Sequence, residues 1–139
     1  MYTSEEFDRE KTKVMKYIIF KKRTESEIRR KFQSQIEENM LEDIIYYLKE
    51  AGYINDYQYI EKQVQEYINL KNMSIKEIKY KLYAKGLNQN IIEQYINQNF
   101  ERLKEYEKKS EENIREKKSN QMDEIELKQY LYKKGYFDE

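Results

Sequence analysis

The sequence contains no cysteine, no histidine and no proline, and only three glycines. Without cysteine and histidine it has no thiol nucleophile, no disulfide, no imidazole for acid–base catalysis and none of the usual zinc ligands. No apolar run approaches the roughly 20 residues of a membrane span, and the N-terminus lacks the basic-then-apolar pattern of a signal peptide. The scarcity of glycine and proline is typical of a chain that is almost entirely helical.

An excess of charge of one sign is also lacking, because 27 basic residues balance 27 acidic ones. A protein that binds DNA without sequence preference is usually clearly basic, since its affinity for phosphate comes from positive charge. Any charge that binds nucleic acid must therefore be segregated on one face. We find no catalytic constellation, phosphate loop or metal-binding motif, so we predict a non-enzymatic protein without cofactor or metal. Nothing points outside the cytoplasm.

A short cassette with both helix ends marked begins at Ser74. Ser74 and Glu77 form an S-x-x-E capping box, and Gly86 follows where a helix ends in a left-handed residue. Between them, Ile78 and Leu82 fall on one face at helical spacing. The pattern predicts a complete short helix.

The same cassette occurs twice more, with caps at Thr24 and Asp123, so that the offsets are 50 and 49 residues. The third copy ends at Gly135, whereas the first carries Ile36 at the glycine position. Repeats of about 50 residues indicate tandem units of three helices each. Strand signals are absent, since neither period-2 alternation nor an Asn-Gly or Asp-Gly turn occurs.

We therefore predict an all-α fold of tandem three-helix repeats, similar to helix-turn-helix units, in an extended curved array. The repeats cover residues 1–54, 55–99 and 100–139, and the third lacks its third helix. Outside the cassettes we expect helices over residues 4–22, 38–51 and 55–70, and from Asn88 onward. Residues 100–120 are highly charged and predict a long, solvated helix, with a flexible linker as the alternative.

The predicted core consists of the apolar positions that share a helix face. In the first helix these are Phe7, Val14 and Ile18, with Met15 and Ile19 as further candidates; in the others they are Leu41, Ile44, Ile45, Leu48, Ile60, Val64, Ile68, Ile78, Leu82, Ile92 and Ile96. A third repeat without its third helix leaves four apolar residues uncovered, namely Leu127, Leu131, Tyr136 and Phe137. We expect them to be poorly ordered or to pack against another repeat or another chain.

The second helix of each repeat is basic. Residues 21–32, 76–85 and 126–134 carry net charges of +4, +3 and +2, whereas residues 37–50 carry −4. Helical geometry directs Arg30 and Lys31 of the first copy, and Lys76, Tyr80 and Lys81 of the second, away from the apolar arcs. Such faces suit phosphates or an acidic protein surface, although an ordinary solvated face is the alternative. Our candidate partner-binding or nucleic-acid-binding residues are Arg23, Arg29, Arg30, Lys31, Lys76, Lys79, Tyr80, Lys81 and Lys128.

Three motifs resemble the RecX family of regulatory proteins. Residues 23–32 (RTESEIRRKF) resemble its R-[ST]-x-x-E-[LI]-R-x-K-[LF] signature, residues 52–60 (GYINDYQYI) its G-[LY]-[LI]-D-D-x-R-[FY]-A, and residues 75–87 its R-I-x-x-E-L-x-x-K-G-[IV]. The resemblance covers roughly residues 10–137. Three positions depart from the family pattern: Gln58 stands for the usual Arg, Asn55 for the first Asp, and Ile36 for the first-repeat Gly.

The resemblance implies an all-helical modulator of the RecA recombinase. Family members are thought to bind in the groove of the RecA–DNA filament and to limit its growth, ATP hydrolysis and strand exchange in recombination, repair and the SOS response. It thus implies the RecA filament as partner, with DNA contacted weakly or through the filament. We expect a cytoplasmic monomer that does not bind membranes. Two alternatives stay open: a helix-turn-helix-like regulator acting on DNA directly, and a scaffold without nucleic acid.

Overall fold

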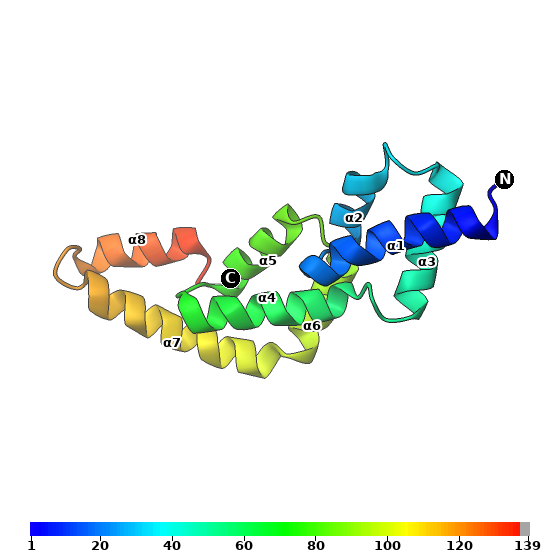
Figure 1. The fold of residues 1–139 in the computed structure, drawn as a ribbon. Helices are drawn as coiled ribbons and strands as arrows, with labels where there is room; N and C mark the ends of the chain where they lie inside the picture. The colour runs from blue at the N-terminus through cyan, green and yellow to red at the C-terminus, as the bar shows by residue number, and fades with distance from the viewer. Residues whose placement is uncertain (137–139) are drawn as a thin grey trace. The chain divides into compact units, whose positions relative to one another are not determined.

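A computed structural model describes residues 1–136, and over this part the chain is all helical, without a strand. Figure 1 shows the eight helices of the described part in order. They are α1 (Ser4–Phe20), α2 (Glu25–Phe32), α3 (Glu38–Glu50), α4 (Asp56–Leu70), α5 (Ile75–Ala84), α6 (Gln89–Gln98), α7 (Phe100–Lys118) and α8 (Glu124–Lys134). The predicted all-α fold is confirmed, and residues 100–118 form a helix rather than a linker.

The predicted capping boxes all form. In each, the side chain of the capping residue accepts the backbone N–H three residues on, and the glutamate there accepts the N–H of the cap, so that two otherwise unpaired donors are satisfied. The boxes pair Thr24 with Glu27, Ser74 with Glu77 and Asp123 with Glu126. A fourth box, which pairs Thr3 with Glu6 at the start of α1, escaped the sequence analysis.

The helix stops follow the glycines. Gly52, Gly86 and Gly135 all have a positive φ, the backbone region that residues with a Cβ adopt at a cost. The first cassette instead ends in a turn over residues 33–35 that leads to Ile36, whose side chain is buried and whose N–H donates to the carbonyl of Phe32. An apolar anchor thus takes the place of the glycine.

The chain divides into two compact units, residues 1–59 and residue 60 onward, with the border inside α4. In the first unit, α1 and α2 both pack against α3. Their buried apolar residues form one cluster that includes Val14, Ile28, Phe32, Ile44 and Leu48. The division into three repeats at residues 54 and 99 stays a prediction.

Of the predicted core residues, Phe7, Met15 and Ile68 are only half-buried and Ile19 is exposed. Ile19 is 72% exposed, because α1 turns only Val14 and Ile18 fully inward. Ile68 is half-buried, and Tyr67 takes the inward place at the end of α4. The other members of the main list, from Leu41 to Ile96, are buried as predicted.

In the second unit, α7 packs against α5, α6 and α8, and α5 also packs against α6. Figure 1 shows α7 and α8 running side by side, joined by a short turn. Leu127, Leu131 and Tyr136 are buried in a cluster with Ile114 of α7, so this end of the chain is covered within its own unit. Phe137 lies outside the described residues.

The end of α8 is attached to the start of α5. The hydroxyl of Ser74 donates to the carbonyl of Lys134, and the Lys134 ammonium lies 2.9 Å from a carboxylate oxygen of Glu77. These polar contacts join the end of the last helix to the preceding cassette, whereas its buried apolar residues cluster with Ile114 of α7.

Candidate functional site

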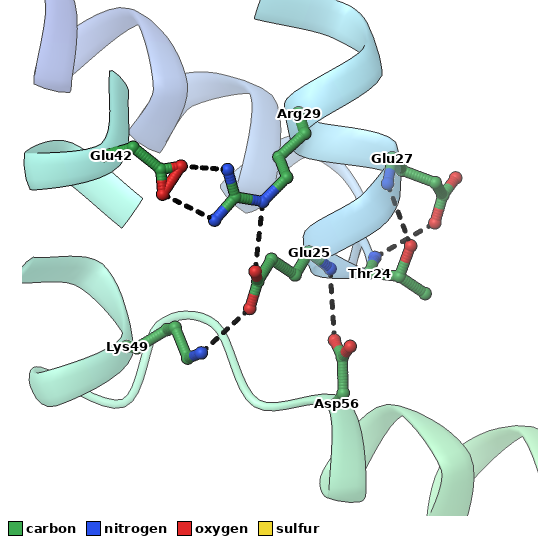
Figure 2. A network of polar contacts seen from close by, with 7 residues as sticks. All are labelled: Thr24, Glu25, Glu27, Arg29, Glu42, Lys49 and Asp56. Carbon is green, nitrogen blue, oxygen red and sulfur yellow. Dashed lines mark hydrogen bonds and ion pairs between the residues drawn. The ribbon is translucent and has the colours of Figure 1, made fainter. Parts of the chain in front are cut away.

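The candidate site begins on α2, where Arg29 is held by carboxylates rather than presented to solvent. Its guanidinium binds Glu42 of α3 through two nitrogens, one of them 3.0 Å from Oε1, and its Nε lies 3.1 Å from Glu25 (Figure 2). Lys49 of α3 reaches Glu25 at 2.9 Å, which extends the pair into a chain of alternating charges. Arg29 thus joins α2 to α3.

The electrostatics of this network favour the charged forms. Hydrogen bonding to Glu42 raises the pKa of Arg29, and the same contact lowers the pKa of Glu42. Partial burial of Glu25 opposes its ionisation, but hydrogen bonds from Lys49 and Arg29 outweigh it and lower the pKa of Glu25. Because these charges are mutually satisfied, Arg29 has little capacity left for an external anion.

Asp56 completes the region at the first residue of α4. One of its carboxylate oxygens accepts the backbone N–H of Glu25, 3.1 Å away, which is the first N–H of α2 (Figure 2). Burial raises the pKa of Asp56, with the nearby charge of Glu25 acting in the same direction, although the N–H of Glu25 opposes the shift. The helix is therefore capped twice, by its own Thr24 and by a carboxylate 31 residues away.

Arg23 precedes the same cap and is mostly buried. Its guanidinium carbon lies 4.1 Å from the centre of the Tyr17 ring, and one nitrogen lies 3.9 Å from Glu27. A cation over an aromatic face is attracted by the negative charge of the ring face. Arg23 therefore joins the end of α1 to the start of α2 and is poorly placed to bind a partner.

Arg30 and Lys31 are the cations of α2 that point outward. Both are exposed, and the Lys31 ammonium lies 5.7 Å from the centre of the Tyr17 ring. They follow Arg29 directly, and helical geometry turns successive residues by about 100°. One helix thus uses one cation for its own packing and presents the next two.

The cassette helix α5 divides its cations in the same way. Lys79 lies 3.1 Å from Glu93 of α6 and is only partly exposed. Lys76 and Lys81 are exposed, and Tyr80 between them is 78% exposed. Lys128 of α8, in the third cassette, is exposed as well.

The start of α5 is held by polar groups that the sequence analysis missed. The buried carboxylate of Glu107 on α7 accepts the backbone N–H of Ile75 at 2.8 Å. The Tyr106 hydroxyl accepts the N–H of Met73 at 3.0 Å and donates to the carbonyl of Lys71 at 2.6 Å. These bonds fix the helix that carries Tyr80.

A sequence signal for Glu107 did exist. Leu103, Glu107, Ser110 and Ile114 recur at intervals of four, three and four residues, which places them on one face of a helix, and all four are buried. A carboxylate at an apolar phase needs a buried partner. It resembles Asp56, because each accepts the first N–H of a cassette helix from a later helix.

Among residues 1–136, no group of three acidic, cysteine or histidine side chains is arranged to hold a metal ion. None of the described helices is both long and apolar enough to span a membrane.

These features define a helical protein with three capped cassette helices, each of which presents at least one exposed cation. No family model matches the chain. It is 30% identical over 135 residues to the regulatory protein RecX of Clostridium acetobutylicum, a match that covers 91% of this chain and 62% of the relative. A second relative of the same name, from Finegoldia magna, is 33% identical over 87 residues, covering 62% of this chain and 42% of the relative.

The fold agrees with these matches. A crystal structure of RecX from Lactobacillus salivarius superposes with a TM-score of 0.79 at 24% identity, covering 98% of this chain and 91% of that one. The chain belongs to the RecX family of regulatory proteins. It spans at most about three fifths of the length of the curated relatives described here.

Proposed function

We propose that this protein is a non-enzymatic modulator of the RecA recombinase that binds the RecA–DNA filament and limits its activity in recombination and DNA repair. Family membership and the three sequence motifs support the proposal. We further propose that it acts in the cytoplasm as a monomer without a cofactor, that its three repeats cover residues 1–54, 55–99 and 100–139, and that it meets DNA weakly or through the filament.

The observation that carries the proposal is that α2 and α5 each have one cation paired within the fold and other cations exposed to solvent. Arg29 and Lys79 are held by carboxylates of the next helix, whereas Arg30, Lys31 and Lys81 are exposed at neighbouring positions of the same helices. We define the outward basic faces as Arg30 and Lys31 of α2 together with Lys76, Tyr80 and Lys81 of α5. Exposed cations on two cassette helices, beside an exposed tyrosine on one of them, suit a partner that offers phosphates or carboxylates.

Net charge restricts the kind of partner. With 27 charges of each sign, the chain as a whole does not attract a polyanion. A filament of protein and DNA presents charges of both signs, so local basic faces are sufficient for it. A ligand made of nucleic acid alone would demand a larger positive surplus.

The test reverses the four cations of the outward basic faces to glutamate: Arg30, Lys31, Lys76 and Lys81. Exposed substitutions away from caps and cores usually change the free energy of unfolding by within about 0.5 kcal/mol each. We expect binding to RecA-coated single-stranded DNA, measured by co-sedimentation, to weaken at least about tenfold because attraction becomes repulsion. Circular dichroism checks the fold first.

A matched control carries the same change in net charge elsewhere. Lys16, Lys62, Lys109 and Lys117 are also exposed, and their reversal to glutamate should weaken filament binding much less. Equal losses in both variants would mean that net charge, rather than the outward basic faces, governs binding. Parallel titrations with bare DNA across a salt series test the alternative, a regulator that acts on DNA directly. In that case the affinity of the first variant for bare DNA should depend less steeply on salt concentration than that of the parent.

A further inference from the structure

The three cassettes carry a basic residue at the same place, five positions after the capping residue. It is Arg29 after Thr24, Lys79 after Ser74 and Lys128 after Asp123. In the first two cassettes this cation pairs with a carboxylate on the following helix, Arg29 with Glu42 and Lys79 with Glu93. The ion pair is therefore a repeated element of the fold.

The acidic partners also share a position. Glu42 lies five residues after Glu37, the capping residue of α3, and Glu93 lies five residues after Asn88, the capping residue of α6. In both helices buried apolar residues stand four, seven and eight positions after the cap. The shared motif is apolar-Glu-x-apolar-apolar: Leu-Glu-Asp-Ile-Ile at 41–45 and Ile-Glu-Gln-Tyr-Ile at 92–96.

Among residues 1–136, nothing pairs with the corresponding face of α8, which is exposed. Lys128 is exposed and forms no ion pair with a carboxylate of residues 1–136. One turn further on, Tyr132 is 61% exposed, whereas Tyr83, at the same place on α5 beside α6, is 37% exposed. Ile125 lies on the same side of α8 and is 71% exposed. An apolar residue, a cation and a tyrosine thus share an uncovered strip, which we call the α8 face.

We propose that the α8 face (Ile125, Lys128 and Tyr132) binds an amphipathic helix of a protein partner that carries the apolar-Glu-x-apolar-apolar motif, with its glutamate paired to Lys128. The arrangement repeats Lys79–Glu93 between two polypeptides. The charge of Lys128 selects a carboxylate, while Ile125 and Tyr132 supply apolar contact area around the pair. This site is separate from the outward basic faces and goes beyond the proposed function.

The test uses a peptide copied from the chain itself, residues 87–99, which contains Ile92-Glu93-Gln94-Tyr95-Ile96. Because a peptide this short is scarcely helical in water, it is stapled through its exposed positions 90 and 94. Titrated into the isotopically labelled full chain, it should shift backbone amide signals of α8. Lys128→Glu should weaken its binding at least about fivefold, and a peptide with Glu93→Lys should recover binding to that variant.

The matched control is Lys133→Glu, which reverses an exposed lysine on the other side of α8 and should leave peptide binding unchanged. Tyr132→Ala tests the apolar part and should weaken binding without affecting the charge exchange. The proposal is overturned if the stapled peptide produces no shifts on α8 at millimolar concentration. It is also overturned if Lys128→Glu and Lys133→Glu behave alike, or if the exchanged charges fail to restore binding.

Discussion

Gly135 offers a sharp test of how α8 is attached to α5. Its φ is +95°, and a Cβ added there would lie 2.8 Å from the Cβ of Lys76 and 3.0 Å from the hydroxyl of Ser74. Both atoms are anchored, the first at the root of a side chain and the second in a capping box. Gly52 provides the control, because its φ is +83° but an added Cβ would meet nothing within 4 Å.

The two positions separate backbone strain from collision. Alanine in the left-handed region costs about 1 kcal/mol, and we expect Gly52→Ala to lower the free energy of unfolding by that amount. Gly135→Ala adds the cost of forcing α8 away from Lys76, about 1–3 kcal/mol for an overpacked contact, and should cost about 3 kcal/mol in total. Asparagine tolerates the left-handed region, so Gly52→Asn should be nearly neutral. Gly135→Asn keeps the collision and should still destabilise.

Urea unfolding monitored by circular dichroism measures the free-energy changes, and amide hydrogen exchange locates them. Since the chain has two compact units, we expect faster exchange in α8 for the Gly135 variants and near the end of α3 for Gly52→Ala. If Gly135→Ala lowers the free energy of unfolding no more than Gly52→Ala does, or if Gly135→Asn leaves it unchanged, then Gly135 does not lie in close contact with α5.

Two further predictions concern caps and pH. Ser74→Ala should lower the free energy of unfolding by about 2 kcal/mol and Asp123→Ala by about 1 kcal/mol. The reason is that Ser74 both caps α5 and donates to the carbonyl of Lys134, whereas Asp123 only caps α8. Equal losses in urea unfolding would mean that the bond from Ser74 to Lys134 contributes nothing. Burial raises the pKa of Asp56 in the folded chain. As the pH rises above the ordinary pKa of aspartate, the unfolded chain releases this proton before the folded chain does. The free energy of unfolding therefore falls as the pH rises. Asp56→Asn keeps an acceptor for the Glu25 N–H but cannot ionise, so the variant should gain stability relative to the parent between pH 3 and 7, and a pH-independent difference would contradict the assigned burial.

The sequence by itself determined the helices and where they begin and end, because those signals are local. A capping box joins residues three apart, and a glycine stop depends on the φ of one residue. Ser74, Glu77 and Gly86 therefore could be interpreted from the sequence, and most of the core followed from helical periodicity. Ile19 and Ile68 were misplaced because the neighbouring helices, which periodicity does not reveal, decide how far the apolar face of a helix is covered.

The partners of the candidate site residues were decided only by the tertiary structure. Helical geometry alone directed Arg30 outward, but it did not show that Arg29 pairs with Glu42, 13 residues away. In the same way Glu107 reaches the first N–H of α5, 32 residues away. Whether a charge is used inside the fold or presented outside depends on which helix lies beside it. Local sequence sets helical phase, but only packing brings the opposite charge within a few ångströms.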